Sequence, residues 1–156
     1  ANSALGKTEE DFYCAIASSF MLSADNAHAV HPHHPQKTDA TNCVYMNEGI
    51  VVKSHAGQKY TSDAVSVAVF KDLCKKANVP VQFFANRSDE AGGSTLGNIA
   101  MAQVSMNSVD IGLPQLAMHY TYETAGIKDT YYMIQVMTEF FNSHISEVNS
   151  HSLKVD

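Results

Sequence analysis

Apolar residues spaced three or four positions apart predict helices in four stretches of the chain. The first begins at Thr8, whose side-chain oxygen is a helix-capping group, and the acidic residues that follow it suit a helix start. The second helix is expected over roughly 63–77 and the third over about 97–106. Asp129 is expected to cap the fourth. Apolar stripes are predicted at Phe12, Ala15 and Ile16 in the first helix, at Val65, Val69 and Leu73 in the second, and at Tyr132, Val136 and Phe140 in the fourth.

Short runs of β-branched and aromatic residues predict strands between these helices. They lie at 18–24, 49–54, 81–85 and 109–113, and Pro114 is expected to end the last one. For residues 18–24 the pattern alone leaves a helix as an open alternative. Strands that alternate with helices predict an α/β fold, with a sheet that carries helices on both faces. Residues 31–42 are expected to form a loop, and the chain after Ser146 is expected to be a frayed polar tail.

Composition excludes several classes of protein. The chain is 45% hydrophobic and 17% charged, which is typical of a folded globular domain. Its net charge is −6 and its largest basic cluster is Lys75-Lys76, so no nucleic-acid partner is expected. No apolar run approaches the ~20 residues of a membrane span, and no signal peptide is visible. Three cysteines without a Cys-x-x-Cys motif indicate reduced thiols and hence a reducing compartment.

The most concentrated chemistry lies between Asp25 and His34, where one carboxylate is followed by four imidazoles. Such a set is suited to a borderline metal ion such as zinc, cobalt or manganese. The spacing matches no standard zinc motif, so a polar loop with solvent-facing histidines is an open alternative. Because this segment follows a predicted strand, its side chains are expected at the edge of the sheet where ligands bind.

A second candidate is His119, which also follows a predicted strand and has Glu123 four residues on. The alternative is a structural histidine among apolar neighbours. A metal site needs ligands from distant segments at one sheet edge, and Asp25 and His119 are both placed for that. The glycine-rich segment 86–97 lacks the lysine of a phosphate-binding loop and is interpreted as a tight turn. The open alternative is that its glycines bring backbone N–H groups close to a ligand.

Several motifs together resemble one family. The run Ser23–Pro32 is similar to the Ser-x-Asp-x-Ala-His-Ala-x-His-Pro signature of the aspartyl aminopeptidases, which are dinuclear zinc exopeptidases. The resemblance covers about residues 8–142. It continues through Ile50–Lys53, Gln58–Tyr60, Ala64–Ser66, Asn86–Asp89, Gly93–Gly97 and Val109–His119.

The resemblance implies a function and a set of site residues. It implies a cytoplasmic zinc aminopeptidase that releases N-terminal residues, acidic ones among them, from peptides. It also implies that two zinc ions, or cobalt or manganese in their place, activate the attacking water. Asp25 is implied as a ligand to one metal and His119 to the other, while His28, Lys53 and Tyr60 line the substrate pocket. Lys53 is suited to pair with a carboxylate and Tyr60 to donate to an oxyanion.

Other features of the family are not found in this sequence. A His-x-Asp element, a bridging aspartate and the Glu-Glu pair that supplies the general base have no counterpart. We therefore expect residues 1–146 to be the C-terminal portion of a metallo-aminopeptidase catalytic domain, followed by a polar tail at 147–156, and to be inactive alone. Tyr120–Glu123 departs from the family's Ser-x-Arg-Glu, which leaves the preferred N-terminal residue open. The resemblance also implies a tetrahedral homo-dodecamer. The alternative is a non-catalytic metal-binding or interaction module on the same scaffold.

Overall fold

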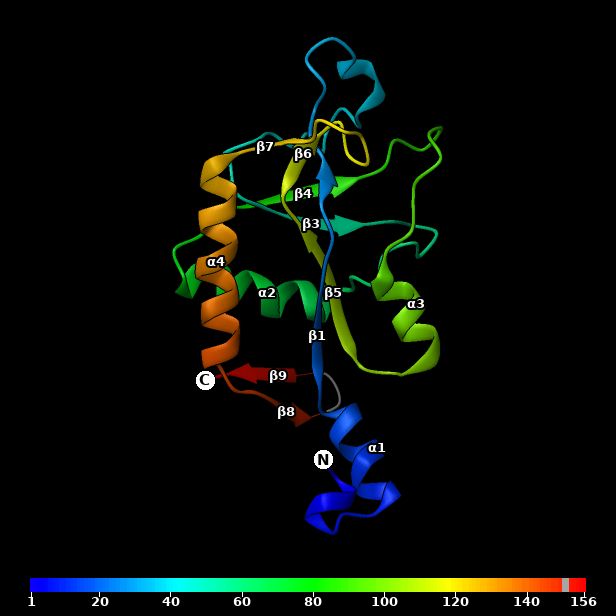
Figure 1. Cartoon of the computed structure of the whole chain (residues 1–156), viewed down its shortest axis with the longest axis vertical. Helices are drawn as coiled ribbons and strands as arrows, with labels where there is room; N and C mark the ends of the chain where they lie inside the picture. The colour runs from blue at the N-terminus through cyan, green and yellow to red at the C-terminus, as the bar shows by residue number, and fades with distance from the viewer. Residues whose placement is uncertain (150–151) are drawn as a thin grey trace.

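A computed structural model describes residues 1–149 and 152–156, and it is a mixed α/β structure (Figure 1). The α-helices are α1 (Glu9–Ala17), α2 (Ala64–Lys76), α3 (Leu96–Gln103) and α4 (Ile127–Asn142), and short 3₁₀ helices lie at Ser3–Leu5 and Pro35–Lys37. The strands are β1 (Phe20–Ala24), β2 (Ala27–His28), β3 (Ile50–Ser54), β4 (Val81–Ala85), β5 (Asn107–Gly112), β6 (Pro114–Leu116), β7 (Thr124–Ala125), β8 (Ile145–Asn149) and β9 (Ser152–Val155). The predicted α/β class is confirmed.

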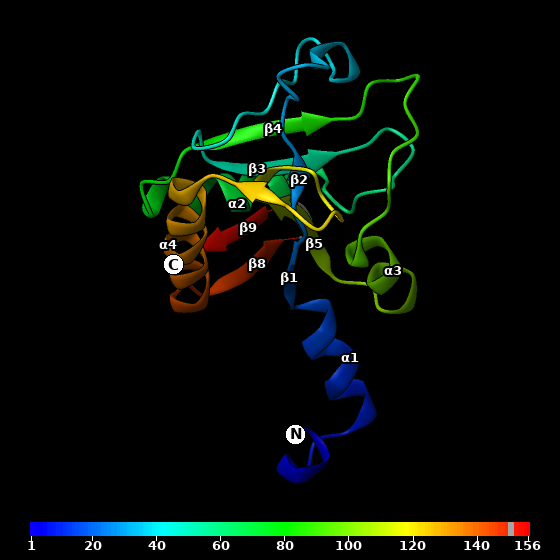
Figure 2. The same ribbon diagram turned by 45° about the horizontal axis from the view of Figure 1, so that its top comes forward.

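The main sheet has four strands in the order β1-β5-β3-β4. β1 runs parallel to β5, and β3 runs parallel to β4, but β3 and β5 are antiparallel. Because β1 and β5 are parallel, their carboxyl ends lie at one edge, where the chain continues into β2 and β6. These two short strands pair with each other, and β6 also pairs with β7, in a second sheet of order β2-β6-β7 that Figure 2 brings to the front.

Alternating side chains give the main sheet two different faces. Ile50, Val52, Val109 and Ile111 face one side and form the core with α2 and with Val136 of α4. The opposite face carries polar residues of β1 and β5 and is approached by α3, where Gly97 lies against Ser23. Helices therefore cover both faces, as predicted, and the polar face leads to the edge where the candidate residues gather.

The helix starts show what local sequence can and cannot specify. Thr8 caps α1 in a reciprocal capping box with Asp11, as the sequence predicts. Asp129 does not cap α4, so that prediction is wrong: the helix starts one turn earlier, after Gly126. Asp129 is instead fully buried, and its two carboxylate oxygens accept hydrogen bonds from the backbone N–H groups of Asn47 and Gly49, at 2.5 and 3.0 Å.

The C-terminal segment is not a frayed tail. β8 and β9 pair as an antiparallel hairpin, and β9 contacts α2. Leu153 and Val155 pack against the core, and Lys76 donates a hydrogen bond to the carbonyl oxygen of Val155 at 2.8 Å. The polar composition of this segment predicted a frayed tail, but its alternate apolar side chains order it against the core. Whether residues 147–156 form a separate unit from residues 1–146 stays a prediction.

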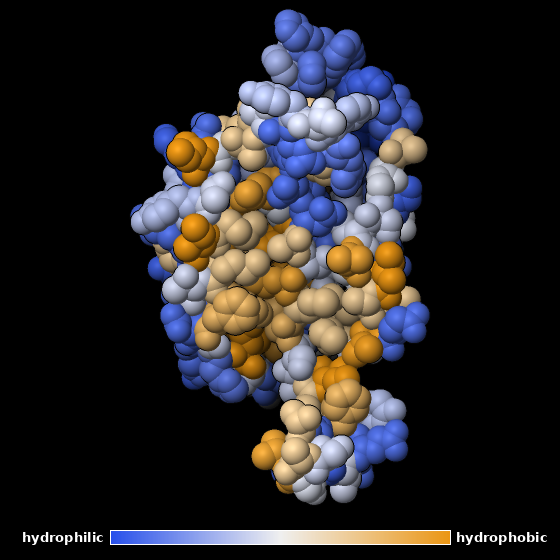
Figure 3. Space-filling model, viewed as in Figure 1, coloured by the Kyte–Doolittle hydropathy of each residue, from blue (hydrophilic) through white to orange (hydrophobic). Residues whose placement is uncertain are grey.

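Apolar side chains also gather on the surface. Figure 3 shows such a region between α4 and α3, and a further group on α1, which extends away from the body in Figure 1. α1 has no buried residue, and its predicted stripe is open to solvent, with Phe12 46% exposed. Ile134 on α4 and Ile99 on α3 are also exposed. Among the described helices, none is long and apolar enough to cross a membrane.

Candidate metal and substrate site

Asp25 lies immediately after β1, at the carboxyl end of the main sheet. Its backbone N–H donates to the carbonyl oxygen of Ile111 at 3.0 Å, which extends the pairing of β1 with β5 by one residue. Gly112 allows this close approach, because a Cβ there would collide with the carbonyl oxygen of Asp25. The backbone of Asp25 is therefore fixed, while its side chain is 47% exposed and free to bind a ligand.

His119 reaches the same place from the loop after β6. Its backbone is left-handed, with φ at 68°, and its N–H donates to the Oε1 of Glu123 at 2.7 Å. The turn that holds His119 is thus stabilised by Glu123, the residue that the sequence placed beside it.

All five predicted site residues line one cavity of about 120 Å³. Asp25, His28 and His119 are exposed at its rim, whereas Lys53 and Tyr60 are buried. Segments that are far apart in the sequence, at 25–28, 53–60 and 119, are therefore brought together. The fold supplies the juxtaposition that the resemblance requires, and the roles of these residues stay proposals.

Lys53 is the buried cation of the site, with 2% of its side chain exposed. It lies on β3, and its Nζ is 3.8 Å from the Oδ2 of Asp25 and 3.4 Å from the carbonyl oxygen of Asn26. The same ammonium lies 5.1 Å from the ring centroid of Tyr60. Burial lowers the pKa of Lys53, and the charges of Asp25 and Asp110 oppose that shift. A cation so poorly solvated is well suited to bind a carboxylate.

His28 and Tyr60 flank this cation. Desolvation lowers the pKa of His28, and the charges of His119 and Lys53 lower it further, so the ring favours its neutral form. Burial raises the pKa of Tyr60, and the carboxylates of Asp110 and Asp25 add to the effect. Tyr60 therefore keeps its proton at neutral pH, and its hydroxyl donates to the Oδ1 of Asn86 at 3.2 Å. Both side chains are neutral hydrogen-bonding groups next to a cation.

One residue that the sequence analysis missed lies beneath the site. Asp110 of β5 is fully buried, and its Oδ2 accepts hydrogen bonds from the N–H and the hydroxyl of Thr61, at 2.6 and 3.1 Å. Its backbone N–H binds the hydroxyl of Ser62. Asp110 therefore holds the turn that carries Tyr60. The signal was present in the sequence, since a carboxylate in the apolar run Val109–Gly112 needs a specific partner.

The donors in the cavity fit zinc in kind but not in number. A carboxylate and an imidazole are ordinary zinc ligands, and neither side chain of Asp25 and His119 is buried in apolar surroundings. No group of three or more His, Cys, Asp or Glu side chains suited to one metal ion occurs in the part of the chain that the structure describes. Asp25 and His119 would thus hold a metal only together with further ligands.

The fold and the site define a class: an α/β domain that presents a carboxylate, an imidazole and a buried lysine at the carboxyl end of its strands. Residues 2–141 match the family model of the aminopeptidase I zinc metalloproteases, M18. The chain belongs to this family, as the sequence motifs predicted.

Individual relatives agree with this assignment. The chain is 51% identical over 138 residues to a probable M18 family aminopeptidase 2 of Clostridium novyi (strain NT), covering 88% of this chain and 32% of that protein. The cryo-EM structure of the Ape4 and Nbr1 complex matches with a TM-score of 0.86 and 36% identity, over 88% of this chain and 26% of that one. The S. cerevisiae mApe1 dodecamer gives a TM-score of 0.76 and 25% identity, over 90% and 31%. The chain thus spans about a third of the length of the curated relatives that it matches.

Proposed function

We propose that this chain supplies the substrate-binding part and two metal ligands of a zinc aminopeptidase that removes N-terminal residues from peptides. The observation that carries the proposal is the single cavity shared by Asp25, His119, His28, Lys53 and Tyr60. Membership of the M18 family supports the zinc-peptidase chemistry. Zinc ions held in this cavity would lower the pKa of a bound water and polarise the scissile carbonyl.

Each residue of this chain has a separate role in the proposal. Asp25 and His119 bind one zinc ion each, together with ligands from outside the described residues. Lys53 pairs with a carboxylate of the substrate, such as the acidic side chain of an N-terminal Asp or Glu residue. Tyr60, which stays protonated, donates a hydrogen bond to the oxygen of the scissile carbonyl as negative charge develops there. His28 contacts the substrate as a neutral imidazole.

Zinc stoichiometry tests the ligand assignments. We would express the full open reading frame that encodes this chain, and measure bound zinc and the release of N-terminal residues from a peptide library. We expect two zinc ions per chain, with a loss of zinc and of hydrolysis in both Asp25→Ala and His119→Ala. Asp72→Ala and His144→Ala are matched controls away from the cavity, at a half-buried and an exposed position, and they should keep both the bound zinc and the hydrolysis. Unchanged zinc uptake in both site variants would show that the assignments are wrong.

The same measurements separate the enzyme from its alternative. We expect no robust peptide hydrolysis from the 156-residue chain alone, because its cavity carries too few donors to hold two zinc ions. A product of the full reading frame that binds metal but hydrolyses no peptide would instead identify a non-catalytic metal-binding module.

Self-association is part of the proposal. The mApe1 structure is a dodecamer, and the apolar side chains exposed on α1, α3 and α4 provide surface that an assembly would bury. We propose a homo-oligomer, which light scattering on the product of the full reading frame would test. A monomer at micromolar concentration would contradict it.

A further inference from the structure

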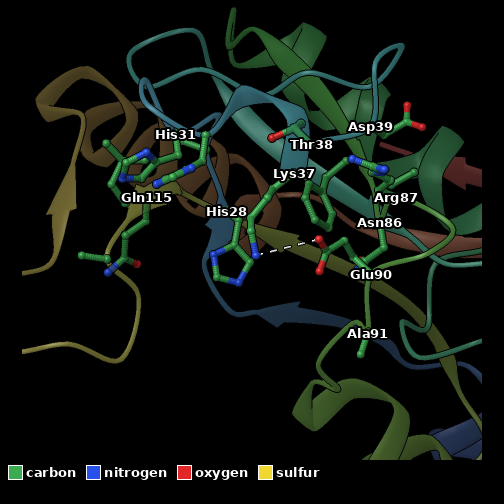
Figure 4. A pocket seen from close by; sticks show the side chains of 16 residues that line it. His28, His31, Lys37, Thr38, Asp39, Asn86, Arg87, Glu90, Ala91 and Gln115 are labelled. Carbon is green, nitrogen blue, oxygen red and sulfur yellow. Dashed lines mark ion pairs between the residues drawn. The ribbon is translucent and has the colours of Figure 1, made fainter.

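A second and larger cavity adjoins the candidate site. It measures about 350 Å³ and is formed by the 31–39 loop, the end of β4 with the turn that follows it, and residues 115–117 (Figure 4). Four residues line both cavities, namely His28, Phe84, Asn86 and Ala91. The larger cavity is therefore a direct extension of the smaller one, and the proposed function leaves it without a role.

The two volumes fit the two parts of an aminopeptidase substrate. A cavity of about 120 Å³ has room for little more than one residue, whereas about 350 Å³ lies in the range that holds a ligand of several residues. An exopeptidase of this kind confines the N-terminal residue and must give the rest of the peptide a path outward. We propose that the larger cavity binds the residues that follow the scissile bond, and that Lys37 pairs with a carboxylate among them. This inference rests on the proposed function.

The charges on its wall single out Lys37. Arg87 is occupied, because its guanidinium binds Asp89 at 2.6 Å and donates to the carbonyl oxygen of Gln36. The Oδ1 of Asp39 accepts four hydrogen bonds from the residues at 41–42.

Lys37 has only a loose partner by comparison. Its Nζ lies 3.9 Å from the Oε1 of Glu90, and the side chains of Lys37 and Glu90 are 67% and 45% exposed to solvent. Figure 4 shows this ion pair reaching across from the 35–37 turn to the turn after β4. Such a pair has little net stability, so a peptide carboxylate can replace Glu90 at small cost.

Nuclear magnetic resonance on the chain itself tests the site without metal or catalysis. We would titrate the ¹⁵N-labelled 156-residue chain with the tetrapeptides Ala-Glu-Glu-Ala and Ala-Lys-Lys-Ala. We expect chemical-shift changes concentrated at 31–39, 85–91 and 115–117, and tighter binding of the Glu peptide. Lys37→Glu replaces an attraction by a repulsion and should weaken binding of the Glu peptide about tenfold. Lys7→Glu makes the same charge change at an exposed residue that does not line the cavity, and it should leave binding of the Glu peptide unchanged.

A second variant tests the cavity rather than the charge. His34→Trp places a larger side chain at an exposed position on the rim of the cavity, and it should weaken the binding of both peptides alike. Absence of binding, shifts centred elsewhere, or equal affinity of wild type and Lys37→Glu for the Glu peptide would each overturn the inference.

Kinetics on the product of the full reading frame distinguish this inference from the proposed function. An aminoacyl amide has no residue after the scissile bond, so Lys37→Glu should spare its hydrolysis and slow that of Ala-Glu-Glu-Ala about tenfold. If that protein with zinc hydrolyses neither substrate, the proposed function fails, and the titration still decides whether the cavity binds peptides. Equal slowing of both substrates would overturn the role of Lys37.

Discussion

The ammonium of Lys53 lies 3.8 Å from the carboxylate of Asp25, and the two side chains differ sharply in exposure: 2% for Lys53 and 47% for Asp25. The pair therefore joins a desolvated cation beneath the cavity to a carboxylate open at its rim. A cation in this position orients the carboxylate and presents positive charge to an incoming ligand. Burial of the cation also carries a desolvation cost, which agrees with the substrate-binding role proposed for Lys53.

Removal of the Lys53 charge should separate stability from function. Lys53→Met keeps the aliphatic stem and removes a buried charge, so we expect the free energy of unfolding to stay the same or rise by about 1 kcal/mol. Substrate binding by the product of the full reading frame should be lost. Urea denaturation of the chain and peptide hydrolysis by that product measure the two effects. A large loss of stability would show that Lys53 is a structural residue.

Gly112 should tolerate no side chain, because the atoms that a Cβ would meet belong to the backbone of Asp25 and Asn26. Gly112→Ala forces these backbones apart, and we expect a loss of about 2 kcal/mol in the free energy of unfolding. Gly93→Ala is the matched control, because a Cβ at Gly93 meets nothing within 4 Å. Urea denaturation of both variants checks the prediction, and equal stabilities would contradict it.

Asp129 should matter for stability through its two backbone partners. In Asp129→Asn one carboxylate oxygen becomes an amide NH₂ group that faces a backbone N–H. We therefore expect the free energy of unfolding to fall by about 2 kcal/mol. Asp72→Asn removes only an exposed ion pair with Lys76 at 3.8 Å and should cost less than about 0.5 kcal/mol. Thermal unfolding of the two variants gives the comparison. If Asp129→Asn proves as mild as its control, the buried hydrogen bonds contribute little.

Cys74 should make the fold sensitive to alkaline pH. Burial raises the pKa of its thiol from 9.0 to about 12, so the folded state keeps a proton that the unfolded state loses in this range. The free energy of unfolding should therefore fall as the pH rises above 9, and Cys74→Ala should reduce that fall. Denaturation curves between pH 8 and pH 11, recorded for the wild type and for Cys74→Ala, measure this fall in the free energy of unfolding. In thiol labelling at pH 8, exposed Cys14 should react first and Cys74 last.

The sequence predicted the elements that local patterns control. Strands β1, β3, β4 and β5, the helices α1 to α4 and the capping role of Thr8 were found close to their expected places. The predictions failed where a distant contact overrides local preference. Aspartate is a common helix-capping residue, but the carboxylate of Asp129 accepts hydrogen bonds from the backbone N–H groups of the 47–49 turn instead. The tail has a polar composition, but its alternate apolar residues pack against the core.

The candidate site divides in the same way. Side-chain chemistry and position after predicted strands singled out Asp25 and His119 from the sequence. The resemblance to the family added His28, Lys53 and Tyr60 as pocket residues. Asp110 was missed although its place in an apolar run signals a specific partner. Only the structure shows that the residue is completely buried and which groups of the 61–62 turn it binds. The larger cavity is likewise invisible in the sequence, since its walls come from three separate segments.

The sequence by itself determined which residue types were available and which family they resemble, because helix and strand periods and motif spacings are written along the chain. Only the tertiary structure decided that Asp25 and His119, 94 positions apart, line the same cavity above a buried Lys53. The physical reason lies in the pairing of strands. Parallel β1 and β5 end at one edge of the sheet, and close packing of Gly112 on the backbone of Asp25 fixes that edge.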